Sequence, residues 1–406
     1  MPTSPVRFRV QRIRDGEWLH HDYPLSDVEI TYTLSGPTQI VGKIEPENRD
    51  LADVGIYPWG TWLIPELDGE IMAPPCIILP SSITQEELRI EAVGFTQYAQ
   101  RQRLRDKFEL GSPTVGIDLD PLDIVRYLWD YIQGAPARDL GVVVDDTKTT
   151  VKLGTPKVES NPDSGPYTLS WWESPNIGQE IDRLAKETPF DYRERAEWKP
   201  DKSGPALHLD LGFPRIGRRR FDLRFAQGEN IDDLQPIEED PELFASTVIV
   251  HGRGEGSEMV QGRADAEHPY TLPITTVIED KTLTTKEACN KRASDELQRR
   301  SLTAESRLQI NEVTLDIYNQ HAPLGSFDVG DEILIHANLA YIGEVALWHR
   351  ITSMTLNINE ETMKLSLVRS GLELQNFDPG FAAPLPSTWA LGVVGSSELG
   401  ETTTLA

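Results

Sequence analysis

Residues 28–34 have the sequence Val28-Glu-Ile-Thr-Tyr-Thr-Leu34, in which apolar and polar side chains alternate. Because successive side chains of a β-strand point to opposite faces, this alternation predicts a strand with one buried face. The same pattern occurs at Val6–Val10 and at Leu88–Phe95. Between two further apolar stretches, Asp68-Gly69 favours a two-residue hairpin turn. The first hundred residues are therefore predicted to form a meander of short strands, arranged as a small barrel or a sandwich.

Length and charge limit the functions that the chain can serve. It has 406 residues, which suits two to four structural units. Its 39 Lys and Arg residues are outnumbered by 65 Asp and Glu residues, which gives a net charge of −26. Such a charge opposes tight contact with the phosphates of nucleic acids, so a repressor or a nuclease is not expected.

Segments for membrane insertion or export are not expected either. No run reaches the ~18 apolar residues that span a bilayer, and Met1–Val10 lacks the apolar stretch of a signal peptide. We predict a soluble protein without a membrane segment, made in the cytoplasm of its host. Cys76 and Cys289 are the only cysteines. They are too few for a disulfide framework or a CxxC metal site, and we expect two buried thiols.

The pattern changes after residue 105. Asp120 precedes Pro121, an arrangement in which Asp120 caps the free N–H groups of a helix and Pro121 occupies its first position. This helix is predicted to bury one apolar stripe, formed by Leu122, Val125, Leu128, Trp129 and Ile132. A second helix is predicted to open at Ser174 and Pro175 and to run to Lys186. With short strands predicted at 142–145, 149–153 and 190–198, residues 106–200 are expected to form an α/β insertion.

β patterning returns from Ala206. Strand-like stretches occur at 208–211, 221–225, 246–250, 272–278, 307–317, 331–337, 351–358 and 362–368. One helix interrupts them, because Thr284-Thr-Lys-Glu has the form of a capping box and opens a segment that runs to about Arg300. Residues 376–406 are rich in Pro, Gly, Ser, Thr and Ala, which predicts an extended or flexible C-terminal arm. The chain is thus predicted to be a β-rich α+β protein with domains at 1–105, 106–200 and 201–375, followed by the arm at 376–406.

Motifs for catalysis and cofactor binding are incomplete. Val248-Ile-Val-His-Gly-Arg-Gly-Glu-Gly256 imitates a dinucleotide-binding fingerprint, but Ser257 stands where the third glycine is needed and Glu255 would repel phosphate. A tight turn or a close backbone approach is the preferred interpretation. Gly42-Lys43 lacks the hydroxyl residue of a P-loop, the eight histidines are dispersed, and no GxSxG elbow occurs. We predict no enzyme activity, with no catalytic, cofactor-binding or metal-binding residue and no cofactor.

Two clusters of arginine stand out against the acidic background. The first consists of Arg7, Arg9, Arg12 and Arg14, and the second of Arg215, Arg218, Arg219, Arg220 and Arg224. A solvated strand face explains such clusters without any function. The functional alternative is an assembly interface, in which guanidinium groups form paired hydrogen bonds with the carboxylates of an acidic neighbour or of a second copy. Contact with DNA is a more distant alternative.

The order of these segments resembles that of siphophage minor tail proteins, specifically the tail-tip (baseplate) hub that is similar to the N-terminal part of tail-associated lysins. The resemblance covers roughly Val6 to Arg369. Within this family, the chain is most similar to the proteins of phages that infect actinobacteria. The resemblance depends on the β-rich start and on the ordered segments Asp120–Trp129, Pro175–Ala185, Phe190–Glu194, Gly228–Ile231, His251–Gly256, Val329–Ile335 and His349–Ser353.

This resemblance implies an architecture and an assembly. Its fold would comprise two tube-like β-barrel domains with the α/β insertion between them. A homotrimer would present six similar barrels to the tail tube, continue that tube, and allow DNA to pass through the lumen without specific binding. Implied partners are the distal tail protein, other tail-tip proteins and the tape measure protein, and the implied location is the virion tail tip.

An enzymatic alternative stays open at this point. Lysin relatives carry an additional cell-wall hydrolase domain, and no stretch after Gln375 has the length for one. The alternative is a hydrolase that cleaves carbohydrate or peptidoglycan with some of its many carboxylates, since paired acidic residues occur throughout an acidic chain. Oligomeric state separates the two hypotheses, because a hub must close a ring.

Overall fold

The computed structural model describes residues 6–45, 55–80, 82–83, 88–110, 115–158, 165–188, 190–235, 244–266, 272–281, 283, 285–300, 310–339 and 343–370. The chain divides into two compact units. The first unit consists of Met1–Asp233, Val313–Ile333 and Arg350–Ser366, and the second of Leu234–Glu312, Leu334–His349 and Leu367–Ala406. The predicted arm at 376–406 lies outside the described residues, and the predicted domain boundaries stay a prediction.

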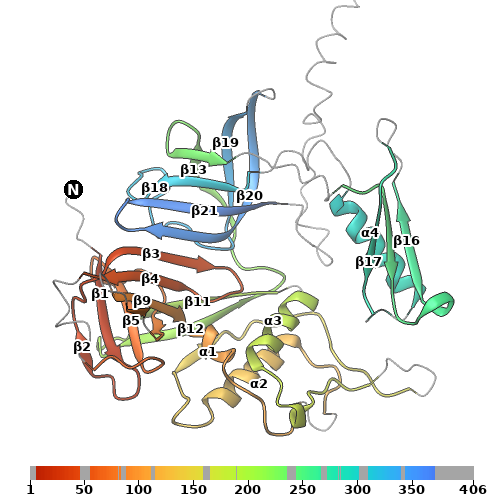
Figure 1. Ribbon diagram of the computed structural model, residues 1–406, viewed down its shortest axis with the longest axis horizontal. Helices are drawn as coiled ribbons and strands as arrows, with labels where there is room; N and C mark the ends of the chain where they lie inside the picture. The colour runs from red at the N-terminus through yellow and green to blue at the C-terminus, as the bar shows by residue number, and fades with distance from the viewer. Residues whose placement is uncertain are drawn as a thin grey trace, which may run out of the picture. The chain divides into compact units, whose positions relative to one another are not determined.

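The short strands predicted at the start of the chain are confirmed, and they form an antiparallel sheet of the first unit (Figure 1). The predicted meander is wrong, because Arg7–Arg12 pairs with Thr61–Leu67 and Gln39–Ile44 pairs with Leu88–Gly94, which do not follow each other along the chain. Its strands are β1 (Arg7–Arg12), β2 (Trp18–His20), β3 (Ser26–Thr33), β4 (Gln39–Ile44), β5 (Thr61–Leu67), β6 (Glu70–Ile71), β7 (Cys76–Ile78), β8 (Ser82–Ile83) and β9 (Leu88–Gly94). The order is β3-β4-β9-β7-β5-β1-β2, with β6 paired to β5 and β8 to β9. Alternation along β3 buries Val28, Ile30 and Tyr32, because the side chains of every second residue share one face.

The hairpin between β5 and β6 has the predicted turn. Leu67 pairs with Glu70, so Asp68 and Gly69 are the two turn residues. Their φ angles are 53° and 85°. Positive φ at both positions matches the right-handed twist of the flanking strands, and Asp-Gly adopts it at low cost.

The later strands join this sheet through β20 (Gly343–Asn357). The others are β13 (Arg219–Ala226), β14 (Ile231–Gln235), β18 (Glu312–Asp316), β19 (Glu332–Leu339) and β21 (Thr362–Arg369). They follow the order β14-β18-β21-β20, β20 also pairs with β3 and β19, and β19 pairs with β13. The β-rich prediction is confirmed. Strand pairing among the described residues closes no barrel, and the two-barrel arrangement with its insertion stays a prediction.

A helical layer covers the first unit beside a small sheet (Figure 1). It contains α1 (Thr96–Ala99), α2 (Pro121–Gln133), a 3₁₀ turn at Trp171–Glu173 and α3 (Ile177–Glu187), and the sheet has the order β10 (Val142–Val144), β12 (Pro205–Gly212), β11 (Asp191–Trp198). The prediction for α2 is confirmed, since Asp120 accepts a hydrogen bond from the Leu122 N–H at 2.9 Å and the whole predicted stripe is buried. Its side chains form the core with β11 and β12.

Two predictions in this layer are wrong in detail. The α3 helix begins at Ile177, and Asn176 caps it by accepting from the Gln179 N–H. Ser174 instead has a left-handed conformation that ends the preceding turn. Residues 149–153 form no strand, because Thr149 turns its backbone to hydrogen-bond Asp120 and its own side chain accepts from the Val151 N–H. Such local side-chain bonds compete with strand pairing.

The second unit has a three-stranded sheet with one helix (Figure 1). The sheet order is β16 (Gln261–Asp265), β15 (Thr247–His251), β17 (Thr275–Glu279), a 3₁₀ turn lies at Gly256–Glu258, and the helix is α4 (Lys286–Arg300). Cys289 and Ala293 on α4 pack against Val248 and Val250 of β15. A methyl group at Gly252 would lie 2.5 Å from the Leu283 carbonyl oxygen. A methyl group at Gly254 would lie 2.8 Å from the Glu258 carbonyl oxygen, so Gly252 and Gly254 serve a close backbone approach, as the sequence predicted.

Candidate functional site

The first predicted arginine cluster is partly neutralised by its own chain. Arg9 donates to Glu66 at 2.9 Å and its guanidinium lies 5.5 Å from the centre of the Trp198 ring. Arg12 donates to Asp15 at 2.8 Å. Arg7 and Arg14 are exposed and form no ion pair with any residue that the structure describes. Only these two keep a cationic surface for a neighbour.

The second predicted cluster is mostly engaged with two carboxylates of β19 and the turn before it. Arg215 and Arg219 donate to Glu332 at 3.1 and 2.6 Å. The backbone N–H of Arg218 donates to Asp331 at 2.9 Å, and its side chain is exposed. Since these partners lie more than 110 residues away along the chain, the arginines fasten the start of β13 to the start of β19.

Arg220 is an internal residue of this cluster, with 7% of its surface exposed. It donates to Asp222 at 2.6 Å, to Asp331 at 3.4 Å and to the Ser326 carbonyl. The Arg220 guanidinium lowers the pKa of the exposed Asp222 carboxyl to about 2. Arg224 is exposed and pairs with Glu229 at 2.6 Å. The structure thus brings Arg215, Arg219 and Arg220 into one internal network, and leaves Arg218 and Arg224 on the surface.

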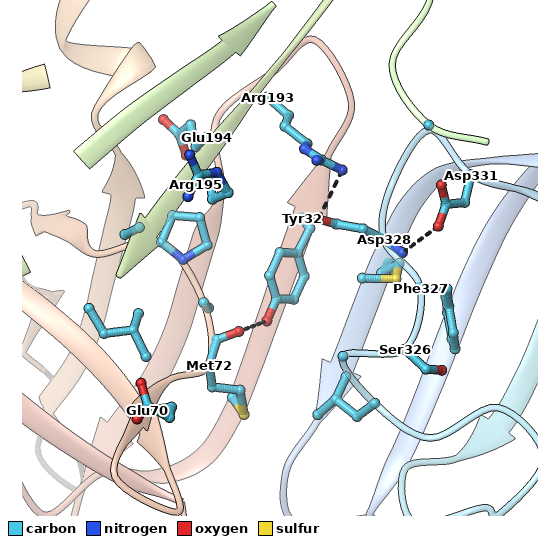
Figure 2. A pocket seen from close by; sticks show the side chains of 18 of the residues that line it. Tyr32, Glu70, Met72, Arg193, Glu194, Arg195, Ser326, Phe327, Asp328 and Asp331 are labelled. Atoms are coloured by element: carbon cyan, nitrogen blue, oxygen red, sulfur yellow. Dashed lines mark hydrogen bonds and ion pairs between the residues drawn. The ribbon is translucent and has the colours of Figure 1, made fainter. Parts of the chain in front are cut away.

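A cleft of about 710 Å³ opens beside this network in the first unit (Figure 2). Its lining comes from β3, from the segment 67–74, from β11, from the segment 217–220, from the loop 324–331 and from Met354 of β20. Figure 2 shows Tyr32 in the middle, with Arg193, Glu194 and Arg195 on one side and Phe327, Asp328 and Asp331 on the other. Sequence analysis did not detect this cleft, because its walls come from six separate parts of the chain.

Hydrogen bonds across the cleft hold its walls in place. The Tyr32 hydroxyl donates to the Met72 carbonyl at 2.9 Å. Arg193 lies 3.0 Å from Asp328, and burial raises the pKa of the Asp328 carboxyl. Burial also raises the pKa of Tyr32 far above its usual range, which keeps the phenol protonated and unable to act as a base or a nucleophile. The cleft thus has polar walls that are held in place by these hydrogen bonds and ion pairs, and an apolar floor.

Glu194 is the most constrained group of the cleft wall. Its carboxylate accepts from the backbone N–H groups of Thr38 and Thr96 at 2.9 and 2.6 Å, and from the Thr96 hydroxyl at 2.7 Å. A methyl group at Gly94 would overlap this carboxylate. Burial raises the pKa of Glu194, opposed by its hydrogen bonds to Thr96 and Thr38. The side chain therefore fastens β11 to the ends of β4 and β9, and sequence reasoning missed it because its donors are 156 and 98 residues away.

The two cysteines and the possible metal ligands among the described residues were the remaining candidates for a chemical site. Cys76 and Cys289 are buried, as predicted, and burial raises the pKa of both thiols, which makes them poor nucleophiles. Among the residues that the structure describes, no three His, Cys, Asp or Glu side chains are placed to hold a metal ion. Across the same ranges, no helix is long and apolar enough to cross a membrane.

Comparison with known proteins places the fold. No protein-family model matches the sequence, and no curated protein matches it. The structure is similar to the 43 kDa tail protein of prophage MuSo2 from Shewanella oneidensis, with a TM-score of 0.57 and 13% identity, covering 89% of this chain and 98% of that one. It is also similar to prophage tail protein gp18 from Listeria monocytogenes EGD-e, with a TM-score of 0.50 and 11% identity, covering 90% and 96%. At this identity the likeness establishes a shared fold with phage tail proteins.

Proposed function

We propose that the chain is a structural, non-enzymatic component of a phage tail tip or baseplate. The observation that carries the proposal is the fold likeness to the MuSo2 tail protein, which extends over 89% of this chain and 98% of the other. Because the similarity extends over nearly the whole of both chains, the two proteins share their complete architecture and not only one widespread domain. The ordered sequence segments that resemble siphophage tail-tip hubs, most similar to those of actinobacterial phages, support the same role independently.

The proposed assembly is a homotrimeric ring that continues the tail tube. Three copies with two tube-like domains each would present six similar units to the tube above, and distal tail, tip and tape measure proteins would be its neighbours. A net charge of −26 supports passage of DNA without adhesion, because like charges repel. A ring needs two different complementary faces on each copy. Arg7, Arg14, Arg218 and Arg224 are exposed, so we assign the basic face to these four.

Mass photometry of the purified chain tests the assembly. We expect trimers at micromolar concentration, and we expect Arg218→Glu with Arg224→Glu to shift the population to monomers without a change in melting temperature. Lys199→Glu is the matched control, since Lys199 is exposed and outside both clusters. Arg220 is left unchanged because it is buried. A wild-type chain that stays monomeric and that also appears as a single copy in images of the tail tip would refute the hub.

A further inference from the structure

A second cavity, of about 230 Å³, lies inside the first unit among α1, α2, α3, β11 and β12 (Figure 1). Among the described residues, none lines both this cavity and the 710 Å³ cleft. Trp129 of α2 and Ile181 of α3 are buried where they line it, whereas Gln97 of α1 and Asp182 of α3 are half-buried. The cavity therefore reaches from the core of the first unit to a mouth between α1 and α3.

Among the described residues that line this cavity, Asp182 is the only charged one. Two side chains fix its carboxylate: the Tyr192 hydroxyl donates to Oδ1 and the Gln100 amide donates to Oδ2, each at 2.7 Å. Burial raises the pKa of Tyr192 far above its usual range, so this phenol stays protonated and remains a donor. Since each carboxylate oxygen can accept two hydrogen bonds, Asp182 can accept from a further donor inside the cavity.

The indole N–H of Trp129 is a buried donor without an acceptor. The Trp129 side chain lines the cavity and 1% of the residue is exposed. Within the part of the chain that the structure describes, its Nε1 forms no hydrogen bond. Buried polar groups in folded proteins nearly always have a partner, because an unmade hydrogen bond is costly. Since the residue has almost no access to the outer surface, the cavity is the space from which an acceptor can reach this N–H.

We propose that this cavity binds one neutral sugar ring, whose hydroxyl groups accept from the Trp129 N–H and donate to the Asp182 carboxylate. A hydroxyl group is both donor and acceptor, whereas an ammonium group could not accept from Trp129 and an anion would be repelled by Asp182. An amide also donates and accepts, but it would leave most of the 230 Å³ empty. The volume lies below the ~300–1,000 Å³ of sites for drug-sized ligands, which limits the ligand to a single ring. The proposal is independent of the assembly proposed above.

Titration of the full-length chain with glucose, galactose and mannose tests the proposal, followed by the indole N–H signals in a proton–nitrogen correlation spectrum. The nine tryptophans give nine such signals, and the signal absent from Trp129→Phe is that of Trp129. We expect at least one of the three sugars, at millimolar concentration, to shift the Trp129 signal most, because its N–H gains an acceptor. Acetate, tetramethylammonium and acetamide at the same concentration should shift this signal less.

Two variants separate this site from unspecific binding. Trp129→Phe keeps an aromatic ring and removes the N–H, and should weaken binding of the sugar about three- to tenfold, the effect of one neutral hydrogen bond. Trp172→Phe is the matched control with unchanged affinity, since Trp172 is 68% exposed. Gln97→Trp adds bulk at the mouth and should abolish binding, which keeps the test valid if Trp129→Phe does not fold. No shift of the Trp129 signal with any sugar, a larger shift with one of the other three probes, or full affinity in Gln97→Trp or in folded Trp129→Phe would overturn the proposal.

Discussion

Gly94→Ala is expected to destabilise the first unit by about 3–5 kcal/mol, although the same change in an ordinary strand stabilises it. Gly94 ends β9 and its φ is not in the left-handed region, so alanine by itself would gain about 0.5–1 kcal/mol from lower entropy of the unfolded chain. A Cβ atom at this position overlaps the Glu194 carboxylate. The carboxylate must then leave, and the N–H groups of Thr38 and Thr96 lose their acceptor.

The magnitude follows from these lost bonds. Each buried donor without an acceptor costs about 1–3 kcal/mol, and two backbone N–H groups and one hydroxyl are affected. Two effects offset part of this destabilisation: the Glu194 charge is no longer buried, and alanine lowers the entropy of the unfolded chain. The expected net loss is about 3–5 kcal/mol. Urea unfolding followed by fluorescence measures it, since Trp62, Trp129 and Trp198 all lie in the first unit. Gly69→Ala is the control, because no atom lies within 4 Å of its added methyl and only its φ of 85° is strained.

A double-mutant cycle decides whether the clash is the cause. In Glu194→Ala the carboxylate is already absent, so adding Gly94→Ala should cost nothing more or should stabilise slightly. Strong coupling between the two positions is therefore expected. Gly94→Ala that leaves stability unchanged, or costs that simply add in the double variant, would refute the contact between Gly94 and Glu194.

Three further predictions concern charge and activity. The pKa of Glu194 in the folded state is raised above the usual 4.5, so the folded state holds the proton more tightly than the unfolded state. The stability of the wild type relative to Glu194→Gln should therefore fall as pH rises from 4.5 through the raised pKa, and then level off. Urea unfolding of both chains across this pH range measures the difference in stability, and a difference that stays constant counts against the raised pKa. Arg220→Met should lower the free energy of unfolding by about 1–3 kcal/mol, because the buried Asp331 would lose its cationic partner and keep only the N–H groups of Arg218 and Asp328, whereas Arg224→Met at an exposed pair should change it by less than ~0.5 kcal/mol; equal melting temperatures would contradict the internal role of Arg220. No clearing of host cell wall is expected in a turbidity assay, and clearing that disappears when one Asp or Glu is replaced would restore the hydrolase hypothesis.

The sequence predicted correctly those features of the fold that depend on residues close together in the chain. The cap at Asp120, the buried stripe of α2 and the Asp68-Gly69 turn each involve residues within about one helical turn or one hairpin, and all three are confirmed. Strand β20 shows the limit. The sequence predicted its second half from Ile351, but missed Gly343–Arg350, because the buried His349 interrupts the apolar alternation. Its ring accepts from the Ile310 N–H and bonds the Leu347 carbonyl, so a polar residue occupies a core position.

The candidate sites depend on contacts that local pattern does not encode. Arg220 belongs to the same sequence cluster as Arg218, yet one is buried and the other exposed. The difference comes from Asp331, which lies 111 residues after Arg220 and whose position only the assembled sheet defines. Glu194 likewise has no local signature as a structural fastener. The arginine clusters in the sequence thus could not separate internal ion pairs from surface charge, and the assembly interface stays a prediction.

This separation changes how an acidic chain of this kind can associate. The chain has 65 carboxylates for 39 Lys and Arg side chains. Among the residues that the structure describes, many guanidinium groups have a carboxylate partner within the chain, as Arg9, Arg12, Arg215, Arg219 and Arg220 do. Few cations are left to offset the repulsion between acidic copies. In the proposed ring, apolar contact between copies, which does not depend on charge, would therefore have to add to the attraction of the exposed arginines. In that ring, the exposed arginines would select the orientation in which copies approach.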